Sequence, residues 1–437
     1  MPISGFPEWL PPQRIIEQRV IDRIRSTFEL YGFSPLETRS VEPLETLLSK
    51  GETSKEVYLL HRLQADESSA KDDELGLHFD LTVPFARFVV ENAGKLVFPF
   101  RRYQIQKVWR GERPQEGRYR EFLQADIDVV NRDNLPFHYD TEMPLVIGDA
   151  LGGLPIPRAR IQVNNRKVCE GFYRGLGLTD TDQVLRTVDK LDKIGPARVL
   201  EQLVATAGAD EKQAQACLDL AAISSEDASF VDAVRKLGVG DPLLDEGLEE
   251  LVRVVETARE HAPGLVVAEL KIARGLDYYT GTVYETQLRG YERFGSICSG
   301  GRYDNLASSG KDRFPGVGIS IGVSRMLGVL FGQQALSVTR PVPTCVLVAL
   351  PHEEQRVACD RIAASLRRRG IPTEVAPTAA KFGKQIQYAD RRGIPYVWFP
   401  GEPDTIKDIR SGDQVEADAA TWAPPADDRH PVISGSE

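Results

Sequence analysis

The sequence lacks the residue patterns that mark metalloproteins and disulfide-stapled proteins. It has five cysteines among 437 residues, scattered without a C-x-x-C pair. Its six histidines form neither an H-E-x-x-H nor an H-x-H pattern. Scattered cysteines in odd number are typical of reduced thiols. We therefore expect no disulfide framework, no zinc site and no catalytic transition metal.

The sequence also lacks long apolar runs and an excess of positive charge. No apolar run approaches the roughly 18 residues of a membrane span, and the first residues lack the basic start of a signal peptide. We therefore expect a cytoplasmic protein with no membrane partner. The 54 lysines and arginines are outnumbered by 64 aspartates and glutamates, for a net charge of −10. Because non-specific nucleic-acid binders are usually basic, any RNA partner would have to be bound by local patches.

Helical and strand patterns are mixed in residues 1–169. Apolar residues recur at helical spacing over 13–31 and stop before Gly32, which predicts an amphipathic helix. Further predicted elements are short strands around 35–39, 57–61, 76–79 and 159–165, a helix over 83–93 and a hairpin over 100–130. Such a mixture favours an α+β domain on a mainly antiparallel sheet.

Residues 170–262 differ, because their pattern is helical throughout. The apolar stripes are Val184, Leu185, Val188 and Leu191, then Leu200, Leu203 and Val204, then Leu244, Leu248, Leu251 and Val255. This predicts a helical insertion, after which the α+β domain resumes over 263–332. Strands are predicted there within 266–289 and 294–299, and 316–332 predicts a strand that runs into a buried helix.

A linker over 333–342 leads to a strand–helix alternation in residues 343–437. Strands are predicted at 345–350, 373–375 and 396–399, and helices at 353–369 and 382–392. Helical crossovers between short apolar strands indicate a small sheet covered by helices. A separate α/β domain of this size is typical of an appended recognition module.

This C-terminal domain also carries basic clusters. They lie at 367–369 and 391–392, with Lys381 and Lys384 between them. Any one cluster is most often a solvated helix face. As a group, they could supply the phosphate contacts that dominate RNA affinity.

Residues 108–130, VWRGERPQEGRYREFLQADIDVV, carry four arginines and five carboxylates on the predicted hairpin. Taken alone, such a stretch is most often a solvated, salt-bridged ribbon. Two other regions resist a purely structural interpretation. One is ARGLDYYTGTVYE (273–285) with SGGRYDNL (299–306), and the other is GVGISIGVSRM (316–326).

Three arginines connect these regions. Arg110, Arg274 and Arg325 lie on apolar-flanked elements of one predicted sheet domain. Buried guanidinium groups must be paired, because an unpaired buried charge is very costly. A polyphosphate is the ligand that uses several planar, bidentate donors at once.

The same stretches resemble the motifs of a known family. The hairpin resembles motif 2 of class II aminoacyl-tRNA synthetases, and 316–326 resembles motif 3. The stretches 273–285 and 299–306 resemble the two histidine-specific signatures of histidyl-tRNA synthetases, and HFDLTVPFARF (78–88) resembles their amino-acid loop. The resemblance implies a class II synthetase fold with a helical insertion and a C-terminal α/β anticodon-binding domain.

The resemblance also implies an activity and a set of site residues. The activity is ATP-dependent ligation of L-histidine to tRNA(His) through histidyl-adenylate, with Mg²⁺ and without a tightly bound metal or organic cofactor. The implied catalytic residues are Arg110, Arg274 and Arg325. The implied ATP-binding residues are Arg110, Glu112, Arg118, Phe122 and Arg325. The implied histidine-binding residues are Asp80, Thr82, Arg110, Gln124, Asp128, Arg274, Tyr278 and Tyr279.

Class II synthetases pair through motif 1, so the resemblance also implies a homodimer. The stretch LETRSVEPLE (36–45) has Arg39 about where the motif 1 proline falls, and Pro43 follows four residues later.

Two other functions fit parts of the sequence. The regulatory subunit of ATP phosphoribosyltransferase shares the catalytic-domain fold, but it typically lacks the anticodon-binding domain and degrades the histidine signatures. A kinase that senses uncharged tRNA would need a kinase signature set, which this sequence does not contain.

Overall fold

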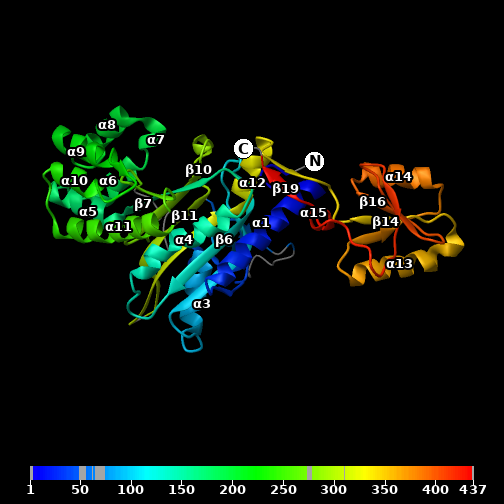
Figure 1. Cartoon of the computed structure of the whole chain (residues 1–437). Helices are drawn as coiled ribbons and strands as arrows, with labels where there is room; N and C mark the ends of the chain where they lie inside the picture. The colour runs from blue at the N-terminus through cyan, green and yellow to red at the C-terminus, as the bar shows by residue number, and fades with distance from the viewer. Residues whose placement is uncertain are drawn as a thin grey trace. The chain divides into compact units, whose positions relative to one another are not determined.

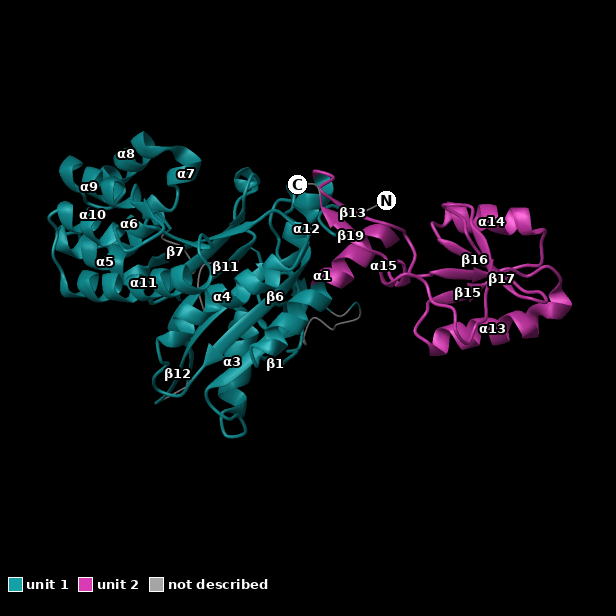
Figure 2. Cartoon of the chain, in the orientation of Figure 1, with its two compact units in different colours: residues 1–7, 21–332 teal, residues 8–20, 333–437 magenta. Residues whose placement is uncertain are grey.

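The structure, a computed structural model, describes residues 3–48, 56–61, 63, 74–272, 278–309 and 311–435. The chain separates into two compact units, coloured in Figure 2. Unit 1 comprises residues 1–7 and 21–332, and unit 2 comprises residues 8–20 and 333–437. The boundary near the N-terminus falls inside α1 (Pro11–Leu30).

Unit 1 is built on a nine-stranded sheet in the order β1-β5-β6-β12-β11-β10-β7-β9-β8. The strands are β1 (Ser34–Pro35), β5 (Phe100–Trp109), β6 (Glu121–Val130), β7 (Ala159–Asn165), β8 (Ser224–Ser225), β9 (Val266–Glu269), β10 (Thr282–Leu288), β11 (Cys298–Ser309) and β12 (Asp312–Gly322). Only the β1–β5 and β7–β9 pairs are parallel. The predicted α+β domain on a mainly antiparallel sheet is confirmed.

The predicted arginine-rich hairpin is the β5–β6 pair near the middle of this sheet. Its register runs without a bulge from Phe100 opposite Val130 to Trp109 opposite Glu121. One face of β6 carries Ala125, Ile127 and Val129, all fully buried. The other face carries polar residues, so the alternation of the sequence is that of a strand with two buried faces of opposite character.

Helices cover the apolar side of the sheet (Figure 1). α4 (His138–Gly152) packs against β7 and β12, and α11 (Pro242–His261) packs against β7, β9 and α4. α3 (Thr82–Asn92) instead packs against β11 from the other face of the sheet, where the Arg102 guanidinium lies over its Phe85 ring. A small sheet of β2 (Val41–Pro43), β4 (Leu75–Leu77) and β3 (Leu59–Leu60) precedes α3, with α2 (Leu44–Leu48) beside it.

The helical region predicted over 170–262 consists of short helices around α11. They are α5 (Arg166–Gly175), α6 (Thr181–Val188), α7 (Leu191–Ile194), α8 (Pro196–Thr206), α9 (Glu211–Ala221) and α10 (Phe230–Lys236). Local signals explain their starts, since Asp210 and Gln213 form a capping box at α9 and Pro242 follows the Asp241 cap of α11. The region also contributes β8 to the sheet, so the prediction of helix alone was wrong for Ser224–Ser225.

The C-terminal part of unit 2 has a five-stranded sheet in the order β15-β14-β16-β17-β18. Its elements are β14 (Val346–Val348), α13 (Arg356–Arg368), β15 (Thr373–Val375), α14 (Phe382–Arg391), β16 (Tyr396–Phe399), β17 (Thr405–Asp408) and β18 (Gln414–Glu416). The first three strands in that order are parallel, and α13 and α14 cover opposite faces (Figure 1). The sequence predicted this alternation but not the antiparallel strands β17 and β18.

Short elements complete the two units. In unit 2, β13 (Leu336–Val338) pairs with β19 (Ile433–Gly435), and α15 (Ala426–Arg429) precedes β19. In unit 1, the turn η2 (Glu292–Phe294) precedes β11, and α12 (Val323–Gly332) follows β12. One predicted core residue was misplaced, because Val204 is 40% exposed while its neighbour Val199 is buried. Within the described ranges, no helix is both long and apolar enough to cross a membrane.

Two glycines allow α5 and α11 to pack closely. A Cβ on Gly171 would overlap the backbone at Leu244, and one on Gly247 would lie 2.6 Å from the backbone nitrogen of Val168. Backbone atoms cannot move aside as a flexible side chain can. These two helices are therefore joined through a contact that only glycine permits.

We expect Gly171→Ala to lower the unfolding free energy of unit 1 by about 1–3 kcal/mol, as overpacking of a close contact does. Gly152→Ala is the matched control, because Gly152 also lies in a helix but has open space around its Cβ position. The melting temperatures of the two variants and the parent give the comparison. Equal melting temperatures for all three would contradict the close contact.

Candidate functional site

The strand register gathers polar side chains on one face of the sheet. On β6 these are Gln124, Asp126 and Asp128; their partners across the strand pairs are Gln106, Gln104 and Arg102 on β5 and Gly322, Ser320 and Gly318 on β12. Residues directly opposite in a ladder point to the same face. The row continues through Ser299, Glu285 and Gln162 on β11, β10 and β7. We call this row the polar floor.

Glycines make room above the polar floor. A Cβ on Gly318 would overlap the Asp128 carboxylate, and one on Gly301 would lie 2.8 Å from the Tyr279 ring. Gly301 belongs to the stretch SGGRYDNL, which forms part of β11 rather than a turn. The glycines of this stretch therefore serve close packing inside a strand.

A buried ion pair lies at one end of the polar floor. Arg102 and Asp128 are 2.6 Å apart, and their side chains are 0% and 3% exposed. The Arg102 guanidinium also donates to the Leu81 carbonyl and lies 4.3 Å over the Phe85 ring. The Tyr303 hydroxyl donates to Asp128 over 2.7 Å. Asp128 is therefore held in one orientation by two donors.

Three carboxyl groups in this region have pKa values above their ordinary range. Burial raises the pKa of Asp126 to about 7 and that of Asp80 to about 6, against the opposing effect of nearby donors and cations. Burial also raises the pKa of Asp128, while Arg102 and Tyr303 act in the opposite direction. Burial therefore disfavours the ionised form of these carboxyl groups, which a positively charged ligand would stabilise.

The segment before α3 places two predicted site residues beside the polar floor. Asp80 is buried, and one of its oxygens accepts from the Val83 backbone N–H over 3.1 Å. Thr82, half-buried, is the first residue of α3. The carbonyls on either side of Asp80 accept from arginines, with Phe79 bound by Arg110 and Leu81 by Arg102.

Three tyrosines form an aromatic cluster over the Asp128 end. The rings of Tyr278 and Tyr279 meet edge-on with centroids 4.8 Å apart, and Tyr278 lies 6.2 Å from Tyr303 in the same manner. Burial raises the pKa of Tyr278 well above its usual range, so its hydroxyl stays protonated and can donate. The paired tyrosines predicted from the sequence thus lie next to Asp128 through Tyr303.

The rest of the polar floor opens into a cleft of about 1100 Å³ within unit 1. Its lining includes Gln124, Gln162, Glu285, Ser299 and Ser320 of the polar floor. The lining also includes six predicted site residues, Arg110, Glu112, Arg118, Phe122, Gln124 and Arg325. The remaining lining includes residues of the helical region and the segment after it, Val188, Asp189, Leu191, Asp192, Lys193 and Lys271.

The hairpin loop arranges a group of charges around one aromatic ring in this cleft. The Arg110 guanidinium lies 5.1 Å over the Phe122 ring, and its Nε donates to the Phe79 carbonyl over 2.9 Å. The Glu112 carboxylate lies 3.8 Å from Arg110 and 3.6 Å from Arg118. Arg110 therefore lines the cleft with its Nε fixed by the protein and its guanidinium over the Phe122 ring.

Arg325 reaches the cleft from the first turn of α12. Its guanidinium donates to the Phe294 carbonyl over 2.6 Å. The tip of the hairpin loop packs on the same helix, because the buried Gly117 has a φ of +70° and room for no Cβ against Val329. The hairpin loop and α12 therefore act as one wall.

The structure brings the described site residues together in two adjoining groups. Gln124 belongs to both, since it lines the cleft and donates to Ser320 over 2.5 Å on the polar floor. Arg274 lies outside the described residues, and its role stays a prediction. Sequence reasoning missed Arg102, Asp126 and Tyr303. The alternation of polar residues on both hairpin strands was the available signal for the first two.

No metal-ligand cluster appears in the part of the chain that the structure describes, since three or more His, Cys, Asp or Glu side chains are nowhere grouped as a metal ion would need. All five cysteines are buried and unpaired with one another.

Comparison with known proteins supplies the family. The histidyl-tRNA synthetase family model matches residues 5–326, and an anticodon binding domain model matches residues 344–420. The chain belongs to the histidyl-tRNA synthetase family. Over its whole length, it is 57% identical to a protein named histidine–tRNA ligase from Cutibacterium acnes, of which it covers 99%.

Solved structures agree with this family. A histidyl-tRNA synthetase from a Nostoc species matches with a TM-score of 0.85 and 35% identity, covering 96% of this chain and 97% of that one. A protein from Bacillus halodurans described as an ATP phosphoribosyltransferase regulatory subunit/histidyl-tRNA synthetase matches with a TM-score of 0.72 over 89% of this chain and 96% of that one. At 18% identity, the second match shows a shared fold alone. The predicted class II synthetase fold with a C-terminal anticodon-binding domain is confirmed.

We expect Arg102→Met to lower the unfolding free energy by about 3–5 kcal/mol, because it leaves Asp128 buried without its cation. The loss should be larger at pH 8 than at pH 5. Without Arg102, burial raises the folded-state pKa of Asp128 further. The variant therefore loses stability as pH rises toward and through that folded-state pKa, whereas at low pH Asp128 is protonated and needs no cation.

The double variant Arg102→Met with Asp128→Asn should recover part of this loss, since both charges are then gone. Arg235→Met is the control, because Arg235 and Asp245 form an exposed ion pair, 47% and 52% exposed, that should be worth at most about 1 kcal/mol. Denaturant unfolding of the four proteins tests this. Equal losses for Arg102→Met and Arg235→Met would contradict a buried, essential pair.

Proposed function

We propose that this chain ligates L-histidine to tRNA(His) in an ATP-dependent reaction that passes through histidyl-adenylate. The proposal rests on one observation: the carboxylate-rich polar floor and the arginine-lined cleft meet at Gln124. The chain in which they meet belongs to the histidyl-tRNA synthetase family. The floor suits an amino acid with a cationic amine. The cleft suits a nucleoside triphosphate.

ATP binds in the cleft, with its adenine ring on Phe122 and its phosphates among the arginines. Arg110 holds the α-phosphate and the histidine carboxylate, and Arg325 holds the far end of the triphosphate. Glu112 meets the adenine edge, and Arg118 lies near the phosphates. Support comes from the half-buried position of Arg110 over Phe122 and from Arg325 on the facing helix start.

Histidine binds on the polar floor. Tyr278, Tyr279 and Asp128 contact the imidazole, because a neutral imidazole has one donor and one acceptor nitrogen that a carboxylate and a hydroxyl can satisfy. Asp80, Thr82 and Gln124 surround the ammonium and carboxylate groups. The fixed orientation of Asp128 between Arg102 and Tyr303 supports its role as an acceptor.

The chemical step is an in-line attack on the α-phosphorus of ATP. A carboxylate oxygen of histidine forms the new P–O bond while the bond to the bridging oxygen of the β-phosphate breaks, and pyrophosphate leaves with that electron pair. No general base is required, since an α-carboxyl group is ionised at neutral pH. Arg110, and Arg274 by resemblance, position the reactants and neutralise developing charge.

Mg²⁺ enters as part of the ATP substrate. Magnesium usually keeps several waters and binds through substrate phosphates and one or two carboxylates rather than an all-protein cage. The cleft lining is consistent with this mode of binding. It contains carboxylates, among them Glu112 and Glu285, but the described residues form no cluster of three or more metal ligands. We propose no tightly bound metal or organic cofactor.

The regulatory-subunit alternative is disfavoured. The chain carries the anticodon-binding domain at residues 344–420 and is similar over its full length to a protein named histidine–tRNA ligase.

We further propose a cytoplasmic homodimer. The expected motif 1 segment includes β2, where Pro43 ends the strand and Arg39 pairs with the buried Glu42 over 2.8 Å.

We propose that the chain is divided into the following domains. Residues 1–169 and 263–332 form the catalytic domain, 170–262 the helical insertion, 333–342 a linker, and 343–437 the anticodon-binding domain.

The basic residues of the anticodon-binding domain do not form one patch, because α13 and α14 lie on opposite faces of its sheet (Figure 1). Arg369 is also occupied, since it donates to the carbonyls of Ala419, Thr421 and Trp422.

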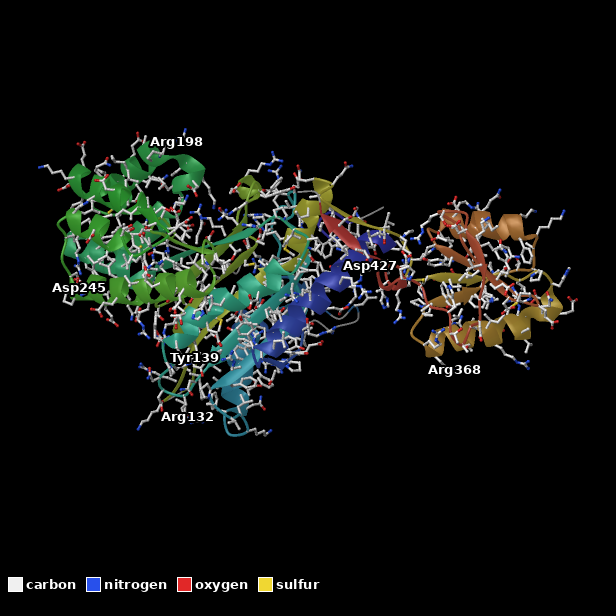
Figure 3. All side chains as sticks on the ribbon, in the orientation of Figure 1. Arg132, Tyr139, Arg198, Asp245, Arg368 and Asp427 are labelled. Atoms are coloured by element: carbon white, nitrogen blue, oxygen red, sulfur yellow. The ribbon has the colours of Figure 1, made fainter. Side chains whose placement is uncertain are left out.

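The start of α14 is the stronger RNA-binding candidate. Exposed Lys381, Phe382 and Lys384 follow the carboxyl end of the parallel strand β15. Helix starts favour anions, and ligands of open α/β sheets bind at this edge. Arg368, exposed near the end of α13, lies toward the opposite edge (Figure 3).

We expect histidine-dependent ATP–pyrophosphate exchange that requires Mg²⁺. Arg110→Lys should reduce it by roughly 10²–10³-fold, because a lysine cannot replace a planar guanidinium that positions two reactants. Arg113→Lys is the matched control, since Arg113 is exposed on the same loop. Exchange with another amino acid but not with histidine would overturn the proposed function.

Lys381→Glu combined with Lys384→Glu should raise the KM for tRNA by roughly tenfold or more and weaken its dependence on salt. The exchange reaction should be unaffected. Arg361→Glu combined with Arg368→Glu is the matched pair on the other face, and it should leave tRNA charging unchanged. Equal losses from both pairs would mean that charge alone, and not the α14 edge, governs binding.

A further inference from the structure

Three buried acceptor atoms of the site have no hydrogen-bond partner among the described residues. They are Asp80 Oδ2, Gln124 Oε1 and Asp126 Oδ1. Their residues are 7%, 8% and 2% exposed, respectively. A buried acceptor left unpaired costs about 1–3 kcal/mol. Three of them in one region indicate a ligand that donates several hydrogen bonds.

Two of these acceptors are joined through one hydroxyl. Gln124 and Asp126 stand two residues apart on β6, so they point to the same face. The Gln124 amide nitrogen donates to the Ser320 hydroxyl over 2.5 Å, and the same hydroxyl acts to lower the pKa of Asp126, opposite Ser320 in the strand pair. The nitrogen of Gln124 is thereby fixed, which leaves its oxygen available, and Asp126 Oδ1 beside it is available as well.

The third acceptor is held against the same strand pair. Asp80 lies between the Phe79 and Leu81 carbonyls, which accept from Arg110 over 2.9 Å and Arg102 over 3.3 Å. Arg102 is itself ion-paired with the next acid along β6. One oxygen of Asp80 is used by the start of α3, so the other remains for a ligand.

We propose that Asp126 is a third acceptor for the α-ammonium group of the substrate, beside Asp80 and Gln124, and so determines specificity for an amino acid over deaminated imidazole compounds. This inference rests on the proposed function. An ammonium group has three donors and no acceptor, which matches three unpaired acceptors. A water molecule could donate only two hydrogen bonds.

The charges of the region lead to the same ligand. Asp80, Asp126 and Asp128 bring three carboxylates, and Arg102 and Arg110 are the guanidinium groups that act on them. When ionised, these carboxylates outnumber the two guanidinium groups, and Arg110 is also shared with Glu112, so a substrate ammonium would compensate an excess of negative charge. Its partner, the substrate carboxylate, is directed to the arginine-lined cleft instead.

A pH dependence follows from the surroundings of Asp126. The groups that face it are Arg102 on β5, Asp128 on β6, Ser320 on β12 and Asp80 before α3. Because burial raises the pKa of Asp126 to about 7, a proton occupies this carboxyl in part of the ligand-free protein near neutral pH. An entering ammonium displaces that proton, so binding weakens as pH falls below about 7.

Two inhibitors of the exchange reaction test the role of Asp126. Histidinol keeps the ammonium, and 3-(imidazol-4-yl)propan-1-ol lacks it. We expect Asp126→Asn to raise the inhibition constant of histidinol by roughly 10–100-fold, as loss of a hydrogen bond to a charged group does, and to leave that of the deaminated alcohol unchanged. Asp232→Asn, on the exposed surface of α10, is the control and should change neither constant.

Equal losses for both inhibitors, or no loss for either, would overturn the assignment. A measurement on the parent chain covers the case of a variant that does not fold. Calorimetry at pH 7 in two buffers of different ionisation enthalpy should show more protons released by histidinol than by the deaminated alcohol, once the protons lost by each inhibitor's own imidazole, known from its titration, are subtracted. Equal release after that subtraction would reject the proposal. Absence of histidine-dependent exchange in the parent rejects the proposed function, whereas normal exchange with an unchanged inhibitor ratio rejects only the role of Asp126.

Discussion

The ion pair between Arg102 and Asp128 is the constraint on which the site depends. The two residues face each other across the β5–β6 hairpin, and both are almost completely removed from water. A shift of one residue in this register would turn every side chain of β6 to the other face. It would also separate two buried charges, which costs several kcal/mol. The pair therefore fixes which residues of the hairpin form the polar floor.

Close packing of strands extends this constraint to the rest of the sheet. Gly318 lies opposite Asp128 on β12, and Gly301 lies opposite Gly318 on β11. Side chains at either glycine would fill the space over Asp128 or against Tyr279. The glycines thus leave space above the polar floor under the aromatic cluster, and the floor is open where the cleft begins. One continuous surface can then hold an amino acid beside a nucleotide.

Much of this arrangement could be predicted from the sequence. The hairpin, the helix after β12 and the C-terminal strand–helix alternation all have strong local patterns, and the motifs identified the arginines of the cleft. Arg102 could not be assigned in the same way, because its partner lies on the other strand and only the register brings them together. Val204 shows the opposite failure. It continues an apolar stripe of α8, yet it is 40% exposed, because the face of α8 that packs against the protein carries Val199 instead.

The central claim is that the polar floor binds histidine while the adjoining cleft binds ATP. A crystal structure of the chain with histidine and a non-hydrolysable ATP analogue tests it most directly. The account predicts the substrate ammonium within roughly 2.7–3.2 Å of Asp80, Gln124 and Asp126, and the α-phosphate beside Arg110. Histidine bound away from the polar floor, or with its imidazole ring at the position assigned to the ammonium, would contradict it.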